Sequence, residues 1–394
     1  MDGGAAWANW SGTVRCAPRA IARPTSEDHL VALMRDAARR GETVRAAGSG
    51  HSHTPLVACD GVIVVLDAFR GIRDCDASRR LARIGAGSLL SSLGAPLRAE
   101  GLAMENLGDV DVQTLAGALA TGTHGTGRRL GSLATQVAGL RLVTPRGEVV
   151  ACSESESPEI FAAARVSLGA LGVASEVTLR LVPAYRLHER ILREDVDACL
   201  ERFEERSRHH RHCEFFWLPG RDVAEVKILD QTQAAPDPLP ERRYERIDHS
   251  DRVLPSVREA RFVELEYALP AATGLACFRE LRALMQRSHP EVVWPVEVRT
   301  VAADDVPLSP AHGRATITLS VHQAADLPYE ALFADAEALL LANGGRPHWG
   351  KWHRCTAAEL SPRYPRWDEF TRVREALDPD GTLLNDHLRA LLGV

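Results

Sequence analysis

At residues 44–56 the chain reads Val44-Arg45-Ala46-Ala47-Gly48-Ser49-Gly50-His51-Ser52-His53-Thr54-Pro55-Leu56, a short apolar strand that runs into a glycine-broken loop. Gly48 and Gly50 let the backbone pass close to a ligand and point successive N–H groups into one concavity, and Ser49 and Ser52 add hydroxyl donors. Such a loop suits a pyrophosphate. It has neither the Lys-Ser/Thr of a Walker loop nor the third glycine of the dinucleotide fingerprint, so an ordinary tight turn is the alternative interpretation.

Two further glycine-rich tracts, residues 105–127 and 167–173, have the same character. The first contains the small-residue segment Leu115–Ala120, which predicts a helix turn that a ligand can approach closely, followed by Thr and Gly donors. The second leads into an alternating strand predicted over residues 174–182. Three separate Gly/Ser/Thr loops together predict one long anionic ligand that is held mainly by backbone groups.

The composition is that of an ordinary globular protein. The 394 residues allow two or three domains of roughly 150 residues each, and the net charge of −6 argues against a nucleic-acid surface. The first residues lack the basic and apolar regions of a signal peptide, and no run approaches the roughly 18 apolar residues of a membrane span. We therefore expect a cytoplasmic protein. Its 8 cysteines include no Cys-x-x-Cys pair, which indicates reduced, mostly structural thiols.

The middle of the chain has a different pattern. Strands are predicted at residues 214–217, 223–229, 262–269, 292–301 and 314–321, and helices near residues 195–208, 270–288 and 328–343. This alternation predicts an α+β region in which helices cover one face of an antiparallel sheet. The Pro-rich stretch 234–243 is predicted to be a surface loop.

Six blocks of sequence, in the same order, resemble one known family. They are Val44 to Leu56, Asn106-Leu107-Gly108, Gln113-Thr114-Leu115-Ala116-Gly117, Ala120-Thr121-Gly122-Thr123-His124-Gly125, His348-Trp349-Gly350-Lys351 and Asp378-Pro379-Asp380-Gly381-Thr382-Leu383-Leu384-Asn385-Asp386. The chain resembles the vanillyl-alcohol-oxidase superfamily of FAD-linked oxidases, and within it the branch of sugar-1,4-lactone oxidases and alditol oxidases. The blocks cover nearly the whole chain, and His-Trp-Gly-Lys is specific to this branch.

The resemblance implies a two-domain flavoprotein of the α+β class. A PCMH-type FAD-binding domain would comprise residues 1–183, an α+β substrate-binding cap domain residues 184–362, and a C-terminal segment, residues 363–394, would return to the FAD domain. The residues implied in FAD binding lie in the glycine-rich tracts: Ala47, Gly48, Ser49, Gly50, Ser52, Gly108, Thr114, Gly117, Thr121, Gly122, Thr123, His124, Gly125, Gly172 and Val173.

His51 stands where this family joins a histidine covalently to the C8-methyl group of the flavin. Such a bond withdraws electron density and raises the flavin potential, which helps the flavin accept hydride from an unactivated alcohol. His53, two residues later, departs from the pattern of most members. The loop position favours His51 as the linked residue.

Strand alternation in Trp294-Pro295-Val296-Glu297-Val298-Arg299 places Glu297 and Arg299 on one face. The resemblance implies that this pair lies beneath the substrate. Glu297 would orient or deprotonate the hydroxyl group, and Arg299 and Lys351 would stabilise the alkoxide and the reduced flavin. Without the resemblance, a solvent-exposed ion pair would be the expectation. The next strand offers two further candidates for lining the cavity, Ser320 and His322.

Two adjacent residues bear on the electron acceptor and the substrate. In the family, a glycine at the position of Gly108 goes with oxygen reactivity, so we expect an oxidase that releases hydrogen peroxide. Asp109 stands where a serine commonly contacts the substrate, and its carboxylate would repel an aldonate and could pair with an amino group. The predicted activity is FAD-dependent oxidation of a hydroxyl-bearing carbon in an aldonolactone, an alditol or a modified or amino sugar, with O2 as acceptor.

Other activities remain as alternatives. One is a flavin dehydrogenase of the same family that uses another acceptor. A remoter one is a metal-dependent hydrolase with ligands from His209, His210, His212, Cys213, His348, His353 and Asp386. No His-Glu-x-x-His or comparable spacing supports it, so no metal site is predicted. A third alternative is a non-catalytic sugar-binding flavoprotein, but it would give Glu297, Arg299 and Lys351 no function.

The expected partners are small molecules. They are a hydroxylated substrate and O2, with neither nucleic acid nor membrane. The expected state of assembly is a monomer or a small homo-oligomer.

Overall fold

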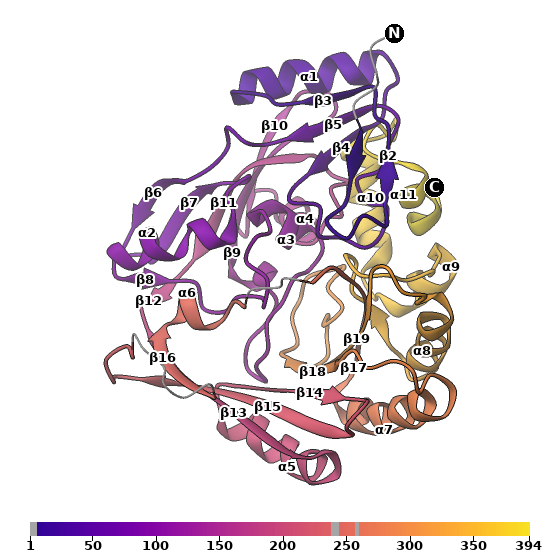
Figure 1. Ribbon diagram of the computed structural model, residues 1–394. Coiled ribbons are helices and arrows are strands. Elements are labelled where there is room, and N and C mark those ends of the chain that lie inside the picture. The colour runs from indigo at the N-terminus through magenta and orange to yellow at the C-terminus, as the bar shows by residue number, and fades with distance from the viewer. Residues whose placement is uncertain (1–5, 238–243, 257–259) are drawn as a thin grey trace.

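The computed structural model describes residues 6–237, 244–256 and 260–394. Figure 1 shows small sheets and helices of the N-terminal half at the top and one large sheet below them. The C-terminal helices α10 and α11 lie beside the N-terminal strands rather than beside the large sheet (Figure 1). The interface between the upper part and the large sheet holds the candidate site.

The loop at residues 48–56 begins at the end of β4, in a small parallel sheet of order β3-β5-β4. Its strands are β3 (Ala20–Ala22), β4 (Val44–Ala47) and β5 (Val62–Val65). A parallel pair needs a crossover connection, and α1 (Glu27–Arg39) supplies it between β3 and β4. Ser26 caps this helix by accepting a hydrogen bond from the amide of His29. The strands β1 (Trp7–Ala8) and β2 (Arg15–Cys16) pair beside it.

A second, antiparallel sheet has the order β10-β9-β11-β7-β6. Its strands are β6 (Ile72–Asp76), β7 (Leu81–Gly85), β9 (Val137–Val143), β10 (Val149–Ser153) and β11 (Val173–Arg180). Short elements connect them: η1 (Leu90–Ser92), α2 (Gly94–Ala99), the pair β8 (Leu102–Ala103) and β12 (Val182–Pro183), α3 (Leu115–Ala120), η2 (Leu133–Gln136) and α4 (Pro158–Ala164).

The large sheet has eight antiparallel strands in the order β16-β13-β15-β14-β18-β19-β17-β20. They are β13 (Arg186–Asp195), β14 (His212–Leu218), β15 (Val223–Thr232), β16 (Glu245–His249), β17 (Phe262–Pro270), β18 (Val296–Val301), β19 (Thr316–Ala324) and β20 (Arg346–Pro347). The helices of this region are α5 (Val196–His209), α6 (Ser250–Val253), α7 (Ala271–Ser288) and α8 (Glu330–Ala342).

One face of the large sheet packs against helices, and the other is polar. Phe215 on β14 contacts Phe203 of α5 and Phe278 of α7, with ring centroids 5.1 and 5.3 Å apart. Tyr267 on β17 donates a 2.8 Å hydrogen bond to Glu337 of α8. Because strand side chains alternate between faces, the neighbours of these residues point the other way, toward the N-terminal part. The predicted α+β architecture is confirmed.

Two details of the large sheet differ from the sequence expectations, and a third expectation lies partly outside the described residues. β18 begins at Val296 rather than at residue 292, directly after Pro295, which has no N–H for the ladder. The strands β13 and β16 were not predicted, because their charged residues hide the alternation. The predicted loop at 234–243 lies partly outside the described residues, which include only 234–237 of it.

The C-terminal elements hold the start of the glycine loop. They are α9 (Ala357–Leu360), η3 (Ser361–Arg363), α10 (Trp367–Leu377) and α11 (Asp386–Leu392). The amide of Val44 donates to the carbonyl of Thr382 at 2.8 Å. The side-chain amide of Asn385 donates to the carbonyls of Pro55 and Ala58, both at 2.7 Å. Residues more than 300 positions apart in sequence therefore fix the loop together.

Candidate active site

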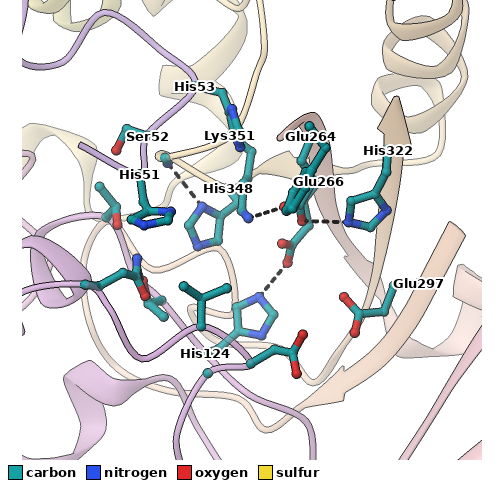
Figure 2. Close-up of a pocket in the computed structure, with 18 of the residues that line it drawn as sticks. His51, Ser52, His53, His124, Glu264, Glu266, Glu297, His322, His348 and Lys351 are labelled. Atoms are coloured by element: carbon teal, nitrogen blue, oxygen red, sulfur yellow. Dashed lines mark hydrogen bonds and ion pairs between the residues drawn. The ribbon is translucent and has the colours of Figure 1, made fainter. Parts of the chain in front are cut away.

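Two cavities meet at the glycine loop. The first, of about 410 Å³, lies against the polar face of the large sheet, and we call it the sheet cavity. The second, of about 260 Å³, runs along the glycine loop into the N-terminal part, and we call it the loop cavity. Figure 2 shows the sheet cavity with His51 on one side and Glu297 on the other. The residues that line both cavities, and so join them, are His51, Ser52, Gln113 and Thr121.

The loop cavity has a wall that only glycine can form. A Cβ on Gly48 would lie 2.2 Å from Oγ1 of Thr114, and Gly50 adopts a φ of +70°. The first position has no room for a side chain, and the second is strained for any other residue. The predicted cofactor-binding residues that line this cavity are Ala47, Gly48, Ser49, Gly50, Ser52, Thr114, Gly117, Thr121 and Gly172.

The other predicted cofactor-binding residues lie elsewhere. Gly108, Thr123 and His124 line the sheet cavity. Gly122, Gly125 and Val173 line neither cavity. Gly122 has a φ of +75°, and a Cβ on Gly125 would lie 2.2 Å from the carbonyl oxygen of Leu107, so both positions need glycine for the path of the backbone. Val173 is buried at the start of β11.

Arg45 ties three loop segments together around the loop cavity. Its guanidinium donates to the carbonyls of Leu56 and Leu168, both at 2.6 Å, and of Gly169 at 3.0 Å, and it also donates to Leu383. Burial lowers the pKa of Arg45 to about 10. These bonds go to main-chain carbonyls, so Arg45 acts as a scaffold for the loops.

His51 lies at the junction of the two cavities. Trp10 stacks on it with ring centroids 4.9 Å apart and an angle of 23° between the planes. Burial, together with the nearby Lys351, lowers the pKa of His51 to about 4, so the imidazole is neutral near pH 7. His53 lines the sheet cavity only, and burial lowers its pKa to about 3.

The pairing of β18 with its neighbours builds the floor of the sheet cavity. Glu297 lies opposite Phe216 of β14 and Ser320 of β19. One oxygen of Glu297 lies 2.5 Å from the guanidinium of Arg299, which also donates to Glu214 at 3.2 Å. Glu297 is 3% exposed and Arg299 8%. The predicted pair is therefore buried, which excludes the solvent-exposed alternative.

Lys351 reaches the same cavity from the segment after β20. It forms an ion pair with Glu264 of β17. Burial opposes ionisation of Glu264, but Lys351 and His322 outweigh it and lower the pKa of Glu264 to about 2. His322 lines the cavity, with its Nδ1 2.8 Å from the carbonyl of Pro295. Ser320, the remaining prediction on β19, is buried opposite Glu266 of β17 and Glu297 of β18 and does not line the cavity.

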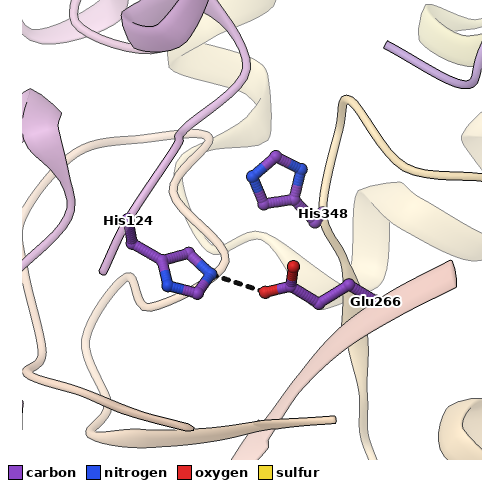
Figure 3. Close-up of side chains that lie close together, drawn as sticks. All are labelled: His124, Glu266 and His348. Carbon is purple, nitrogen blue, oxygen red and sulfur yellow. Dashed lines mark hydrogen bonds and ion pairs between the residues drawn. The ribbon is translucent and has the colours of Figure 1, made fainter. Parts of the chain in front are cut away.

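His124, Glu266 and His348 lie together at the edge of the sheet cavity (Figure 3). Nε2 of His124 is 2.5 Å from Oε1 of Glu266, and Nδ1 of the same ring is 2.8 Å from the carbonyl of Gly125. Nδ1 of His348 accepts a 3.1 Å hydrogen bond from the amide of Gly350. Within the described part of the chain, these three side chains are the group whose potential metal-ligand atoms all lie within 4.8 Å of one another.

The histidines of the hydrolase alternative do not converge on one site. His210 at the end of α5 hydrogen-bonds Asp230 at 2.7 Å. His353 packs against Trp349 and His387, with ring centroids 6.3 and 6.4 Å away. His348 points instead into the sheet cavity.

Gly108 and Asp109 lie where the two halves of the molecule meet. A Cβ on Gly108 would lie 3.1 Å from the methyl group of Thr123. The carboxylate of Asp109 accepts a 2.7 Å hydrogen bond from Ser256 and lies 3.9 Å from both Lys227 and Arg299. Two cations therefore already face the carboxylate that was predicted to contact the substrate.

Several residues of the site were missed by the sequence predictions. Glu264 and Glu266 alternate with Val263 and Leu265 on β17, and carboxylates at that period in a buried strand are the signal that could have revealed them. Other missed residues of the site carry no such signal in the sequence. They are Trp10, Glu214, Phe216, Lys227, Phe262 and Trp294.

Comparisons with known proteins identify the family of the chain. Residues 18–153 match the FAD binding domain family, and residues 177–246 and 239–391 match the D-arabinono-1,4-lactone oxidase family. The L-gulono-1,4-lactone dehydrogenase of Mycobacterium tuberculosis is 39% identical, over 98% of this chain and 99% of that protein. The L-gulonolactone oxidase of Bos taurus is 30% identical and the alditol oxidase of Streptomyces sp. 31% identical, each over 98% of both chains.

The cholesterol oxidase of B. sterolicum shares the fold. Its crystal structure superposes with a TM-score of 0.85 over 98% of this chain and 96% of that one, at 16% identity. None of the helices that the structure describes combines the length and apolar character that a membrane crossing requires. The glycine-walled cavity, the PCMH-type FAD-binding fold and these matches agree, and the chain belongs to the D-arabinono-1,4-lactone oxidase family of FAD-dependent oxidoreductases.

Proposed function

We propose that this protein is an FAD-dependent oxidase that acts on a hydroxyl-bearing carbon of an aldonolactone, an alditol or a modified or amino sugar and releases H2O2. The observation that carries the proposal is the buried Glu297–Arg299 pair with Lys351, in a cavity continuous with the glycine-walled loop cavity. The relatives support the substrate class, since they are named as enzymes of sugar lactones and alditols.

The loop cavity fits FAD, because its backbone-lined glycine wall suits a pyrophosphate. When bound, FAD supplies the acceptor for the hydride. Glu297 takes the proton of the substrate hydroxyl at its carboxylate, and Arg299 pairs with that carboxylate. Arg299 and Lys351 stabilise the negative charge that develops on the oxygen. The substrate loses one hydride and one proton and leaves as a carbonyl compound, and O2 takes up two electrons and two protons.

His51 is proposed as the covalent attachment point of the flavin. Its place between the two cavities and its neutral imidazole near pH 7 support it, since the neutral ring is the nucleophilic form. The test is a visible spectrum after acid precipitation of the wild type, His51→Ala and the matched control His53→Ala. We expect yellow pellets from the wild type and His53→Ala and a yellow supernatant from His51→Ala. A yellow pellet from His51→Ala would overturn the assignment.

Oxygen is proposed as the acceptor because of Gly108. A dehydrogenase is the second candidate, favoured by the name of the 39% identical relative. Peroxide release compared with dye reduction in a screen of lactones, alditols and amino sugars separates the two. In Gly108→Ala, a methyl group 3.1 Å from Thr123 would narrow access, and we expect peroxide release to fall more than dye reduction. Equal loss of both would count against a gating role for this position.

The charge of the sheet cavity supports a neutral or cationic substrate. Its wall carries the carboxylates of Asp109, Glu264, Glu266 and Glu297, against the fixed cations Arg299 and Lys351. An anionic aldonate would meet this excess of negative charge. An amino sugar remains the specific proposal for Asp109. If Asp109→Ser keeps the same substrate preference and affinity in the screen, that proposal is wrong.

The organisation of the chain belongs to the same proposal. The FAD domain would be residues 1–183 with the returning segment 363–394, and the cap residues 184–362. The hydrogen bonds of Asn385 to the loop after β4 support the return. A cytoplasmic location and a monomer or small homo-oligomer complete the proposal, and sedimentation of the purified holoenzyme tests the state of assembly.

A further inference from the structure

The ring of His124 faces a hydrogen-bond acceptor at each nitrogen. Nδ1 lies 2.8 Å from the carbonyl oxygen of Gly125, which can only accept. Nε2 lies 2.5 Å from Oε1 of Glu266. A neutral imidazole has one N–H and one lone pair, so it cannot satisfy two acceptors. One additional proton is therefore held between the ring and the carboxylate.

The neighbouring groups decide on which side that proton lies. Glu266 is 3% exposed, and burial alone would favour its neutral form. The contact with His124 and the charge of Lys351 outweigh burial and hold the pKa of Glu266 well below its usual range. Arg299 of β18 acts on the same carboxylate. The ionised form of Glu266 places the proton on His124.

A metal ion in place of the proton is disfavoured by the tautomer of His348. Its Nδ1 accepts the amide hydrogen of Gly350, so the proton of the neutral ring is on Nε2. Burial lowers the pKa of His348 to about 4, which keeps the ring neutral. The ring therefore has no lone pair to give to a metal, and His124 and Glu266 alone make an incomplete ligand set.

We propose that Glu266 keeps His124 doubly protonated, and that this imidazolium is a third cation of the sheet cavity, beside Arg299 and Lys351, which stabilises negative charge formed during the oxidation. The protonation state of His124 rests on the ring's two contacts and on the charges around Glu266. The electrostatic role rests on the proposed function.

The experiment uses holoenzyme labelled with 15N-histidine, with the His124 signals assigned by their loss in His124→Gln. We expect both ring nitrogens of His124 to be protonated in the wild type. In Glu266→Gln the amide can donate to Nε2, so we expect one protonated and one unprotonated nitrogen. The matched control is Glu264→Gln, which removes an equally buried carboxylate two residues away that pairs with Lys351, and it should leave His124 doubly protonated.

Several results would overturn the proposal. A singly protonated His124 in the wild type would do so without any variant, and so would a doubly protonated His124 in Glu266→Gln. Stoichiometric divalent metal held by these residues in the purified holoenzyme would as well. For the electrostatic role, we expect the rate of flavin reduction in Glu266→Gln to fall about a hundredfold with little change in KM. An unchanged rate, with the protonation changed as expected, would remove that role. The 15N-histidine spectra do not depend on the identity of the substrate. A failure of the proposed protonation state can therefore be distinguished from a failure of the proposed function.

Discussion

Glu297 and Arg299 show how burial changes the meaning of an ordinary ion pair. On a surface such a pair contributes little to stability. Here both side chains are nearly buried and Arg299 also bonds Glu214, so removing one partner leaves an uncompensated charge beside the cavity. Strand alternation alone places the two on one face, but it does not say which face is buried.

Replacing Glu297 by Gln tests its role at the residue scale. The amide keeps the shape of the carboxylate but cannot take a proton, so we expect the rate of flavin reduction by substrate to fall about 10²- to 10⁴-fold. The FAD content should stay unchanged. Anaerobic stopped-flow absorbance measures the rate, with Glu154→Gln, an exposed partner of Arg180, as the control. A reduction rate equal to that of the wild type would rule out Glu297 as the proton acceptor.

At the scale of elements, Lys227 of β15 links three strands of the large sheet. Its Nζ lies 3.2 Å from Glu214 of β14 and 3.7 Å from Glu189 of β13. Glu214 in turn holds Arg299 of β18. A chain of charges therefore runs across the sheet from Lys227 to the Glu297–Arg299 pair. Lys227 positions Glu214, and Glu214 positions Arg299.

Removing Lys227 should destabilise the sheet through the charges it leaves behind. We expect Lys227→Met to lower the free energy of unfolding by about 3 kcal/mol, because it leaves the buried carboxylates of Glu214 and Glu189 with one cation fewer. Urea denaturation measures it. The double variant Lys227→Met/Glu214→Gln should recover much of the loss. If the double variant is no more stable than the single one, the pair is not the source of the effect.

Asn385 joins the last helix to the glycine loop. Its side chain caps α11 by accepting from the amide of Leu388 and donates to the carbonyls of Pro55 and Ala58. Asn385→Ala should cost about 2 kcal/mol from the lost cap and the unsatisfied carbonyls, and should weaken FAD retention. Thermal unfolding and the visible-to-ultraviolet absorbance ratio measure the two effects. Asn385→Asp keeps the cap but loses both donors. If this variant retained FAD as well as the wild type does, the hydrogen bonds of Asn385 to the glycine loop would not be needed for FAD retention.

For the whole molecule, the buried histidines set the response to acid. Burial lowers the pKa of His53, His212 and His353 to about 3 and that of His348 to about 4, from an ordinary value of 6.5. Between these values the unfolded chain binds protons that the folded chain does not, so stability falls as pH falls.

We therefore expect the stability to decline from about pH 6.5 downward, before the carboxylates titrate. Each of the four histidines adds at most about 1.4 kcal/mol per pH unit. Urea midpoints across this pH range measure the decline. Replacing His212, which lies outside the two cavities, by Gln should make the decline shallower. A midpoint independent of pH down to the carboxylate range would contradict the prediction.

The sequence by itself determined the features that depend on local geometry. The glycine loop at Gly48 and Gly50 and the shared face of Glu297 and Arg299 follow from the backbone freedom of glycine and from strand periodicity. The fold class and the cofactor were implied by the resemblance of six sequence blocks to a known family, and the family matches confirm both.

Only the tertiary structure decided what those features touch. His124 and Glu266 are 142 positions apart, and the partners of Lys227 and Trp10 are set by strand register and by loops that meet across the two cavities. Periodicity reports which side chains share a face but not what lies against it. Burial, pairing and proton placement at this site therefore come from contacts between distant segments.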